Sequence, residues 1–304
     1  MPRQFTRLAT TSCAVLVAAA TVLAGCGSSS QSGSATKPTV TTKADSKLAA
    51  MVPQEIKADK KIRVGTDASY APNEFMDADG KTVIGMDVEL YDAIAAKLGL
   101  RVDWVPSEFG NILPAVQSGK YEAGVSSFTI NPERTKQVLM ISYFNSPIQW
   151  VTEKGNPKKV SIDSACGLQV GVQKDTVEVP DLEARSKKCV AAGKPKIGVQ
   201  ALPGQDTVTS NVVTGKYDAM TADLPIAVYA VRQSQGKLAL LGEPYGQAPY
   251  GFIVGKDQKK FADAIAAATK AIIDDGTYAK ILKKWGNEKG AITADRVKVE
   301  SASS

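Results

Sequence analysis

The sequence predicts an α/β protein that is divided into two lobes of similar architecture. Apolar runs of strand length alternate with helical patterns through most of the chain, and this alternation favours parallel sheets. A helix end, a Gly-Lys-Tyr turn and a strand occur together twice, and the two copies begin 96 residues apart. About 235 residues, 54–290, lie between the N-terminal segments and the C-terminal tail, which is enough for one large core or two small ones.

Each predicted strand is a short apolar run between polar or glycine-containing stretches. The predicted strands are 62–66, 101–105, 122–126, 168–172, 196–202, 218–222, 238–241 and 251–254. The helix predicted over 87–98 places Val88, Tyr91 and Leu98 on one face and stops at Gly99. Further helices are predicted from near 111 and over 224–233, 259–275 and 278–285.

The repeated helix–turn–strand pattern covers 118–127 and 214–223. In each copy the strand ends on polar residues. A repeat of this kind predicts two α/β units of about 100 residues each. The alternative is a chance similarity between two ordinary helix-to-strand turns.

The first 25 residues have the pattern of a secretory signal peptide. Arg3 and Arg7 give a positive start, no acidic residue precedes Asp45, and an apolar run covers 8–23. This run is shorter than the about 20 residues that a membrane span needs. We expect residues 1–25 to be removed on export.

Residues 23–26, Leu-Ala-Gly-Cys, resemble the lipobox of bacterial lipoproteins. The resemblance implies that Cys26 carries a lipid with acyl chains such as palmitate, whereas the other interpretation of Cys26 is a small buried thiol. Residues 26–53 are rich in small and polar residues and predict a flexible stalk. The expected location is the extracytoplasmic face of the cell membrane, with the lipid as the link to the membrane.

The remaining cysteines, Cys166 and Cys189, are expected to form a disulfide because an exported chain enters an oxidising compartment. Closing that loop contributes roughly 3 kcal/mol on the chain-entropy model. The chain has no histidine, which excludes Ser-His and Cys-His nucleophile pairs. Two cysteines alone do not complete a zinc site, so we expect no metal and no cofactor.

The formal net charge of +6 falls to +4 once Arg3 and Arg7 leave with the signal. Pairs of lysines are dispersed along the chain and are not interleaved with aromatic residues. They indicate a solvated surface rather than a nucleic-acid site.

Polar residues follow several predicted strands, at the edge where parallel α/β sheets bind ligands. They are Asp67 and Tyr70 after the first strand, Ser126, Ser127, Thr129 and Arg134 after the third, Asp175, Thr176 and Val177 after 169–173, and Asp223 after 218–222. Taken alone, these residues also fit turns, helix caps, a surface arginine or ordinary core aromatics. Asn131 is expected to cap a helix that begins at Pro132. The shared position at strand ends predicts a polar cleft between the lobes.

Motifs in a fixed order resemble those of bacterial extracellular solute-binding proteins of family 3, the polar amino-acid receptors of ABC importers. The motifs are Val64–Phe75, Gly85–Leu90, Asn111–Tyr121, Ser126–Arg134, Val170–Gln173 with Thr176, Ala222–Asp223, Ala248–Gly251 and Asp275–Trp285. The resemblance implies the type II periplasmic-binding-protein fold, in which two α/β lobes joined by a two-strand hinge close on the ligand. It implies lobe 1 at 54–145 and 250–290, lobe 2 at 146–249, crossings near 144–148 and 246–250, and a C-terminal tail at 291–304.

The resemblance also implies how the cleft holds the main-chain carboxylate of an amino acid. Arg134 would bind it through a bidentate pair, with help from Thr129. The backbone of Thr176 and Val177 would meet the same group from lobe 2. Ser126 belongs to the same expected set of ligand-binding residues.

The rest of the ligand is assigned in the same way. Asp223 would take the α-ammonium group together with Ser127. Tyr70 and Phe109 would enclose the ligand side chain, and Asp67 would reach its tip. Because a like charge in a dry cleft is costly, Asp67 argues against acidic ligands and favours arginine, lysine, ornithine, histidine or glutamine.

The expected partners are a free polar amino acid and the permease and ATPase subunits of an ABC importer, with the receptor itself a monomer. The chain departs from the family pattern at Asn73, where an aromatic is usual, and at Val177, where Thr or Gly is usual. An alternative is a dehydratase of the same fold, with Glu74 or Glu178 as an acid of raised pKa. Another is a sensory or adhesive lipoprotein that uses the same cleft.

Overall fold

The computed structural model describes residues 42–302, so the predicted signal peptide and Cys26 lie outside the described residues. In this part of the chain the strands are β1 (Lys61–Thr66), β2 (Ser69–Tyr70), β3 (Glu74–Met76), β4 (Val83–Ile84), β5 (Arg101–Pro106), β6 (Ala123–Gly124), β7 (Leu139–Glu153), β8 (Gln169–Gln173), β9 (Gly198–Leu202), β10 (Ala219–Asp223), β11 (Leu238–Val254) and β12 (Val299–Glu300). The helices are α1 (Ser46–Met51), α2 (Gln54–Lys57), α3 (Met86–Lys97), α4 (Phe109–Gln117), α5 (Pro132–Thr135), α6 (Glu178–Ala191), α7 (Gln205–Val213), α8 (Leu224–Gln233), α9 (Lys259–Asp274) and α10 (Thr277–Trp285), with 3-10 turns at Glu288–Gly290 and Ala294–Arg296.

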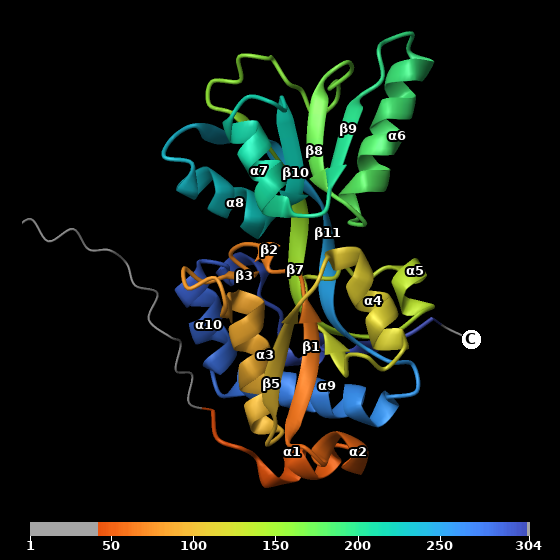
Figure 1. The fold of residues 1–304 in the computed structure, drawn as a ribbon, viewed down its shortest axis with the longest axis vertical. Coiled ribbons are helices and arrows are strands. Elements are labelled where there is room, and N and C mark those ends of the chain that lie inside the picture. The colour runs from red at the N-terminus through yellow and green to blue at the C-terminus, as the bar shows by residue number, and fades with distance from the viewer. Residues whose placement is uncertain (1–41, 303–304) are drawn as a thin grey trace, which may run out of the picture. The chain divides into compact units, whose positions relative to one another are not determined.

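Most strands belong to one sheet with the order β5-β1-β6-β11-β7-β10-β8-β9, and β12 pairs with β7. On one side β5, β1 and β6 are parallel, and on the other β10, β8 and β9 are parallel. We call the first group, with the small sheet β2-β3-β4 and helices α1–α5, α9 and α10, lobe 1, and the second group, with α6–α8, lobe 2 (Figure 1). The predicted architecture of two α/β lobes is therefore confirmed.

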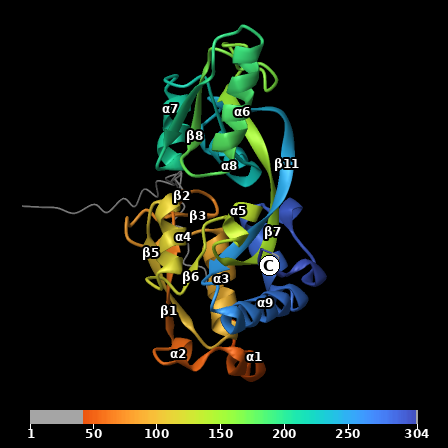
Figure 2. The same cartoon turned by 90° about the vertical axis from the view of Figure 1, so that its right-hand side faces the viewer.

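The two lobes are joined by β7 and β11, which are antiparallel to each other and run through both lobes (Figure 2). Their ladder extends from the pair Leu139 and Val254 in lobe 1 to the pair Glu153 and Leu238 in lobe 2. The predicted crossings lie opposite one another, since Phe144 pairs with Tyr250. The register shifts between 241 and 248 interrupt the ladder, and such bulges bend a strand locally. The connection is therefore a two-strand hinge, as expected.

The sequence underestimates these long strands. β11 is one strand of 17 residues where two short ones were predicted, and the 15 residues of β7 were anticipated only as a crossing. Nearly every residue of β7 is buried, so it lacks the alternation that marks a strand with one solvated face. The small sheet β2-β3-β4 and helices α6 and α7 were also not predicted.

Both ends of the described chain are more ordered than predicted. Residues 46–51, assigned to the stalk at 26–53, form α1, whose first turn is capped by Asp45 and whose Leu48 packs on the core of lobe 1. Residues 299–300, assigned to a tail at 291–304, form β12, which pairs with Met140 and Ile141 of β7. The apolar contact of α1 extends the folded part toward the N-terminus, and pairing of β12 with β7 extends it toward the C-terminus.

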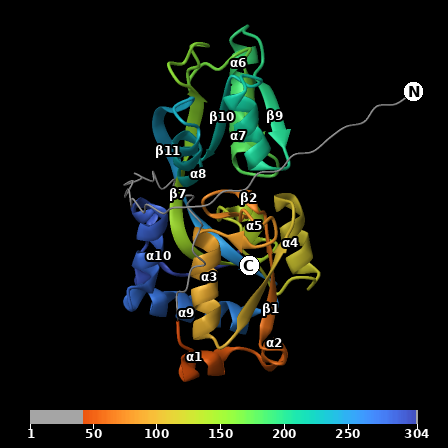
Figure 3. The same cartoon turned by 60° about the vertical axis from the view of Figure 1, so that its left-hand side comes forward.

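Each lobe has its own apolar core. In lobe 1, α3, α9 and α10 pack together over the sheet through residues such as Ile94, Ile265 and Ile281 (Figure 3). In lobe 2, Trp150 and Leu182 are fully buried in a second cluster. The predicted disulfide between Cys166 and Cys189 is confirmed, and it ties the loop before β8 to α6 beside that cluster.

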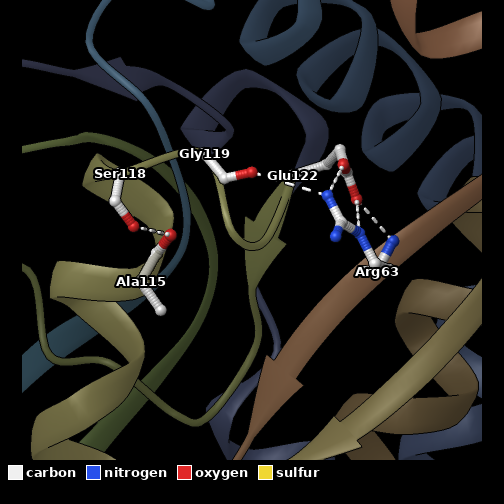
Figure 4. Close-up of polar contacts among 5 residues, drawn as sticks. All are labelled: Arg63, Ala115, Ser118, Gly119 and Glu122. Atoms are coloured by element: carbon white, nitrogen blue, oxygen red, sulfur yellow. Dashed lines mark hydrogen bonds and ion pairs between the residues drawn. The ribbon is translucent and has the colours of Figure 1, made fainter.

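The first copy of the Gly-Lys-Tyr pattern closes the turn between α4 and β6 (Figure 4). The Ser118 hydroxyl donates to the Ala115 carbonyl at 3.1 Å. Arg63 of β1 donates to the Gly119 carbonyl at 3.5 Å and pairs with Glu122 at 2.7 Å. These contacts fix the end of α4 against the neighbouring strand, and with it the entry to β6.

Both copies of this pattern pack alike. A methyl group added to Gly65 of β1 would lie 2.5 Å from the Tyr121 ring, and one added to Gly171 of β8 would lie 2.7 Å from the Tyr217 ring. Each tyrosine therefore covers a glycine on the parallel strand next to its own. This equivalence favours a structural repeat over chance similarity.

Candidate functional site

A small cavity lies between the lobes, at the carboxyl ends of the parallel strands. It is lined by Tyr70, Phe109, Ser126, Ser127, Thr129, Arg134, Gln173, Thr176, Val177, Glu178 and Asp223. The structure brings together nine of the ten residues expected to bind ligand. The tenth, Asp67, is not among the lining residues.

Arg134 is positioned by the short helix α5. As predicted, Asn131 caps this helix by accepting from the Arg134 N–H at 2.9 Å, and Pro132 occupies its first position. The Arg134 guanidinium donates from Nη1 to the Thr129 carbonyl at 2.8 Å and from Nη2 to the Asp175 carbonyl of lobe 2 at 3.2 Å. These bonds fix the plane of the guanidinium at the boundary between the lobes.

Two aromatic rings support the same guanidinium. Phe109 and Phe128 stack with their centroids 4.7 Å apart, and the Arg134 guanidinium carbon lies 5.2 Å and 5.6 Å from them. A cation over aromatic faces is attracted by their quadrupoles. Burial lowers the pKa of Arg134, while the nearby carboxylates of Glu178 and Asp223 oppose that shift. An arginine stays charged under these conditions, so the cavity contains a fixed cation.

Asp223 faces Arg134 from lobe 2. It is the last residue of β10 and is 5% exposed. The Tyr70 hydroxyl of lobe 1 donates to its Oδ2 at 2.8 Å. Burial, followed by repulsion from Glu178, raises the pKa of Asp223 well above its usual range. A cation placed beside Asp223 would relieve this cost.

Ser126 and Ser127 rest on two buried carboxyl groups. The Ser126 hydroxyl donates to Glu74 Oε1 at 3.2 Å and accepts from the Asp67 N–H at 3.0 Å. The Ser127 N–H donates to Asp87 Oδ2 at 3.1 Å, and its hydroxyl lies 3.1 Å from the same oxygen. Ser127 has a φ of 48°, a conformation that costs energy for a residue other than glycine. The carboxyl groups therefore hold a strained loop in place at the cavity.

The hydrogen bonds that hold Ser127 explain why Asn73 departs from the family pattern. Asn73 is fully buried, and its amide donates to the Ser127 hydroxyl at 2.9 Å. An aromatic residue would not supply this bond. Burial raises the pKa of Asp87 to about 6 and that of Glu74 well above its usual range, and their mutual repulsion adds to the effect on Glu74.

Asp67 has different partners from those expected. Its Oδ1 accepts from the Ser69 N–H at 3.1 Å and hydroxyl at 2.6 Å, and its Oδ2 accepts from the Phe109 N–H at 2.8 Å and Gln173 Nε2 at 3.0 Å. Both oxygens are therefore occupied by protein donors. Because Gln173 belongs to lobe 2, Asp67 bridges the lobes here, and its position in the sequence did not reveal this.

Thr176 and Val177 reach the cavity at the start of α6. The Thr176 hydroxyl donates to the Gln173 carbonyl at 2.8 Å, which closes the turn after β8. Val177 is the N-cap residue of α6, and the first N–H groups of a helix have no partner within it. Such a helix start favours anions, in agreement with the backbone role expected for these two residues.

Two lining residues were missed as ligand-binding candidates. Gln173 ends β8, so the rule that selected Asp223 at the end of β10 would have found it. Glu178, the first residue of α6, was considered only as the acid of a dehydratase. Within residues 42–302 no cluster of acidic, cysteine or histidine side chains is suited to a metal ion.

Two lobes with a small, buried, oppositely charged cavity between them define a solute receptor of the type II periplasmic-binding-protein fold. The sequence profile of the bacterial extracellular solute-binding proteins, family 3, matches residues 62–288, and the chain belongs to this family. Among the described residues no helix is long and apolar enough to cross a membrane.

Named relatives agree with this assignment. The arginine-binding protein ArgT of Corynebacterium glutamicum is 34% identical over 246 residues, which cover 81% of this chain and 80% of the relative. The solved structure of an ancestral arginine-binding protein bound to arginine has 33% identity and a TM-score of 0.69, and the match covers 74% of this chain and 98% of that one.

A third relative bears on the enzyme alternative. The ancestral amino-acid-binding protein AncCDT-1, described as a precursor of cyclohexadienyl dehydratase, has 30% identity and a TM-score of 0.65, over 76% of this chain and 97% of its own. It is itself described as a binding protein, as are the two relatives above. The chain is accordingly assigned as a binding protein and not as an enzyme.

Proposed function

We propose that this protein captures a basic amino acid between its lobes and presents it to an ABC importer. The observation that carries the proposal is the pairing of Arg134 from lobe 1 with Asp223 from lobe 2 on one small buried cavity. An amino acid has one carboxylate and one ammonium group on the same carbon. Opposite charges on facing walls suit that arrangement.

Arg134 binds the α-carboxylate in this proposal. Its guanidinium is already oriented by carbonyl groups and aromatic rings, so little side-chain entropy remains to be lost on binding. The start of α6 at Val177 approaches the same anion from lobe 2. Asp223 receives the α-ammonium group, and the Tyr70 hydroxyl keeps its carboxylate in position.

Hinge closure completes the site. The cavity walls come from both lobes, and β7 and β11 are the strands that connect them. In a closed and dry cavity, complementary charges interact more strongly than they do in water. Binding and closure are therefore coupled.

The preference for a basic ligand is supported by the relatives, which are named for arginine, and by the excess of carboxylates over cations on the cavity wall. A thermal-shift screen of the twenty amino acids and ornithine tests it, because a ligand that binds only the folded state raises the midpoint of unfolding. We expect arginine, lysine or ornithine to give the largest shifts. A response confined to acidic or apolar amino acids would refute the proposal.

The remaining proposals concern the membrane attachment of the protein and its partner proteins. The sequence around Cys26 supports a lipid anchor, and mass spectrometry of the exported protein should find a diacylglycerol on Cys26 as the new N-terminus. The family supports ABC permease and ATPase subunits as partners. Co-purification with a membrane permease would favour transport over a purely sensory role.

A further inference from the structure

Glu178 is the lining residue whose carboxylate is least used by the protein. It begins α6, is 1% exposed and lines the interlobe cavity. Its Oε1 is buried and has no hydrogen-bond partner among residues 42–302. An unpaired carboxylate oxygen in a buried site is costly unless something else pairs with it.

The contrast with Asp67 is informative. Both oxygens of Asp67 accept hydrogen bonds from protein groups, and Asp67 does not line the cavity. Glu178 lines the cavity and retains a free acceptor. Of these two carboxylates, Glu178 is therefore the one available to a ligand.

Counting the charges on the wall leads to the same residue. Arg134 supplies one positive charge, and Asp223 and Glu178 supply two negative charges. A neutral zwitterion balances Arg134 and Asp223 but leaves Glu178 without a counter-charge. A ligand with one additional cationic group balances all three, and burying an uncompensated charge costs several kcal/mol.

We propose that Glu178 pairs with the side-chain cation of the bound amino acid and thereby selects basic over neutral ligands. This inference rests on the proposed function, since it assumes that an amino acid occupies the cavity. A local role at the start of α6 is the competing explanation, because acids stabilise helix N-termini. That role does not require an acid to be buried in a cavity wall with a free oxygen.

The test compares arginine with citrulline, which has nearly the shape of arginine but no side-chain charge. Calorimetry would measure both ligands on the wild type and on Glu178→Gln, which keeps the size of the side chain. We expect the variant to lose about 30-fold or more in arginine affinity, which corresponds to about 2 kcal/mol, and to bind citrulline as well as or better than the wild type. Lysine and glutamine form a second pair with the same expectation.

Two control variants sharpen the result. Glu183→Gln removes the same charge from an exposed position on α6 and should leave the ratio of arginine to citrulline affinity unchanged. Asp67→Asn tests the residue first expected at the tip of the ligand side chain. This variant should not lower the ratio of arginine to citrulline affinity. Equal losses for arginine and citrulline in Glu178→Gln would overturn the inference, as would a loss of selectivity in Asp67→Asn alone.

The inference and the proposed function fail in different ways. If the wild type binds no basic amino acid, the proposed function is wrong. If the wild type prefers arginine and Glu178→Gln retains that preference, only the role of Glu178 is wrong. Should Glu178→Gln unfold, Glu178→Asp, which keeps the charge on a shorter side chain, is expected to retain the preference for arginine over citrulline at reduced arginine affinity. Loss of that preference in Glu178→Asp would count against the role.

Discussion

The Tyr70 hydroxyl of lobe 1 donates a hydrogen bond to Asp223 of lobe 2 at 2.8 Å, so the group proposed to hold the ligand ammonium is itself positioned from across the hinge. The Asp223 backbone N–H also donates to the same hydroxyl, at 3.3 Å. One phenol thus ties the lobes together and orients the carboxylate that we propose binds the ligand ammonium.

Replacement of Tyr70 by Phe should weaken amino-acid binding. The ring stays, but Asp223 loses a donor in a buried position, which typically costs about 1–3 kcal/mol. We expect arginine affinity to fall by about 5- to 150-fold in calorimetry. Tyr217→Phe, in which the tyrosine packs on Gly171 away from the cavity, is the matched control. Unchanged affinity in Tyr70→Phe would show that this bond does not contribute to the bound state.

Replacement of Arg134 by Lys should strongly weaken amino-acid binding although the charge is kept. Lysine lacks the planar fork that binds a carboxylate bidentately, and it cannot keep the bonds to Thr129 and Asp175 in the same plane. We expect a loss of about 100-fold or more for every amino-acid ligand, and complete loss in Arg134→Ala. Arg101→Lys, at an exposed position of β5, should bind normally. Near-normal affinity in Arg134→Ala would refute the site.

The affinity for arginine should increase with pH. Burial raises the pKa of both Asp223 and Glu178, so protons compete with a cationic ligand above the ordinary carboxyl pKa of about 4. Binding therefore releases protons, and affinity should rise between about pH 5 and about pH 8 while the guanidinium of arginine stays charged. Calorimetry in buffers of different ionisation enthalpy would count the protons. Proton uptake, or no change with pH, would contradict this assignment.

The buried pair of Glu74 and Asp87 should make stability decrease as pH rises. Because burial raises both pKa values, the folded protein keeps protons that the unfolded chain has already released above about pH 4. Glu74→Gln removes one of these groups, so the unfolding free energy of the variant should fall less steeply with increasing pH than that of the wild type. Urea unfolding over that pH range measures the difference. Glu55→Gln, at an exposed site on α2, should follow the wild type throughout.

Elements with a strong local signal could be predicted from the sequence. Helix α8 has the predicted bounds, and α5 has the predicted cap at Asn131, because capping and amphipathic spacing act within a few residues. β7 could not be predicted, since a strand buried on both faces carries no alternation. Its length depends on partners 85 to 115 residues away in β11.

Like the fold, the candidate site could be predicted from the sequence only in part. Position at a strand end identified Asp223 and Arg134, whose place follows from chain order in a parallel sheet. It could not separate Asp67 from Glu178, because that depends on which oxygens the protein itself occupies. Only the packed structure places Gln173 of lobe 2 beside Asp67 of lobe 1.

Burial of the cavity charges has a consequence for a receptor that works outside the cytoplasm, where ionic strength varies. Dissolved salt screens charges that face water, but it screens buried pairs much less. Asp223 and Glu178 are almost inaccessible to solvent, so ions in the medium cannot easily compete at these carboxylates. Salt would therefore affect the encounter between receptor and ligand more than the lifetime of the closed complex. Retention of the captured amino acid would then be insensitive to the salinity of the surroundings.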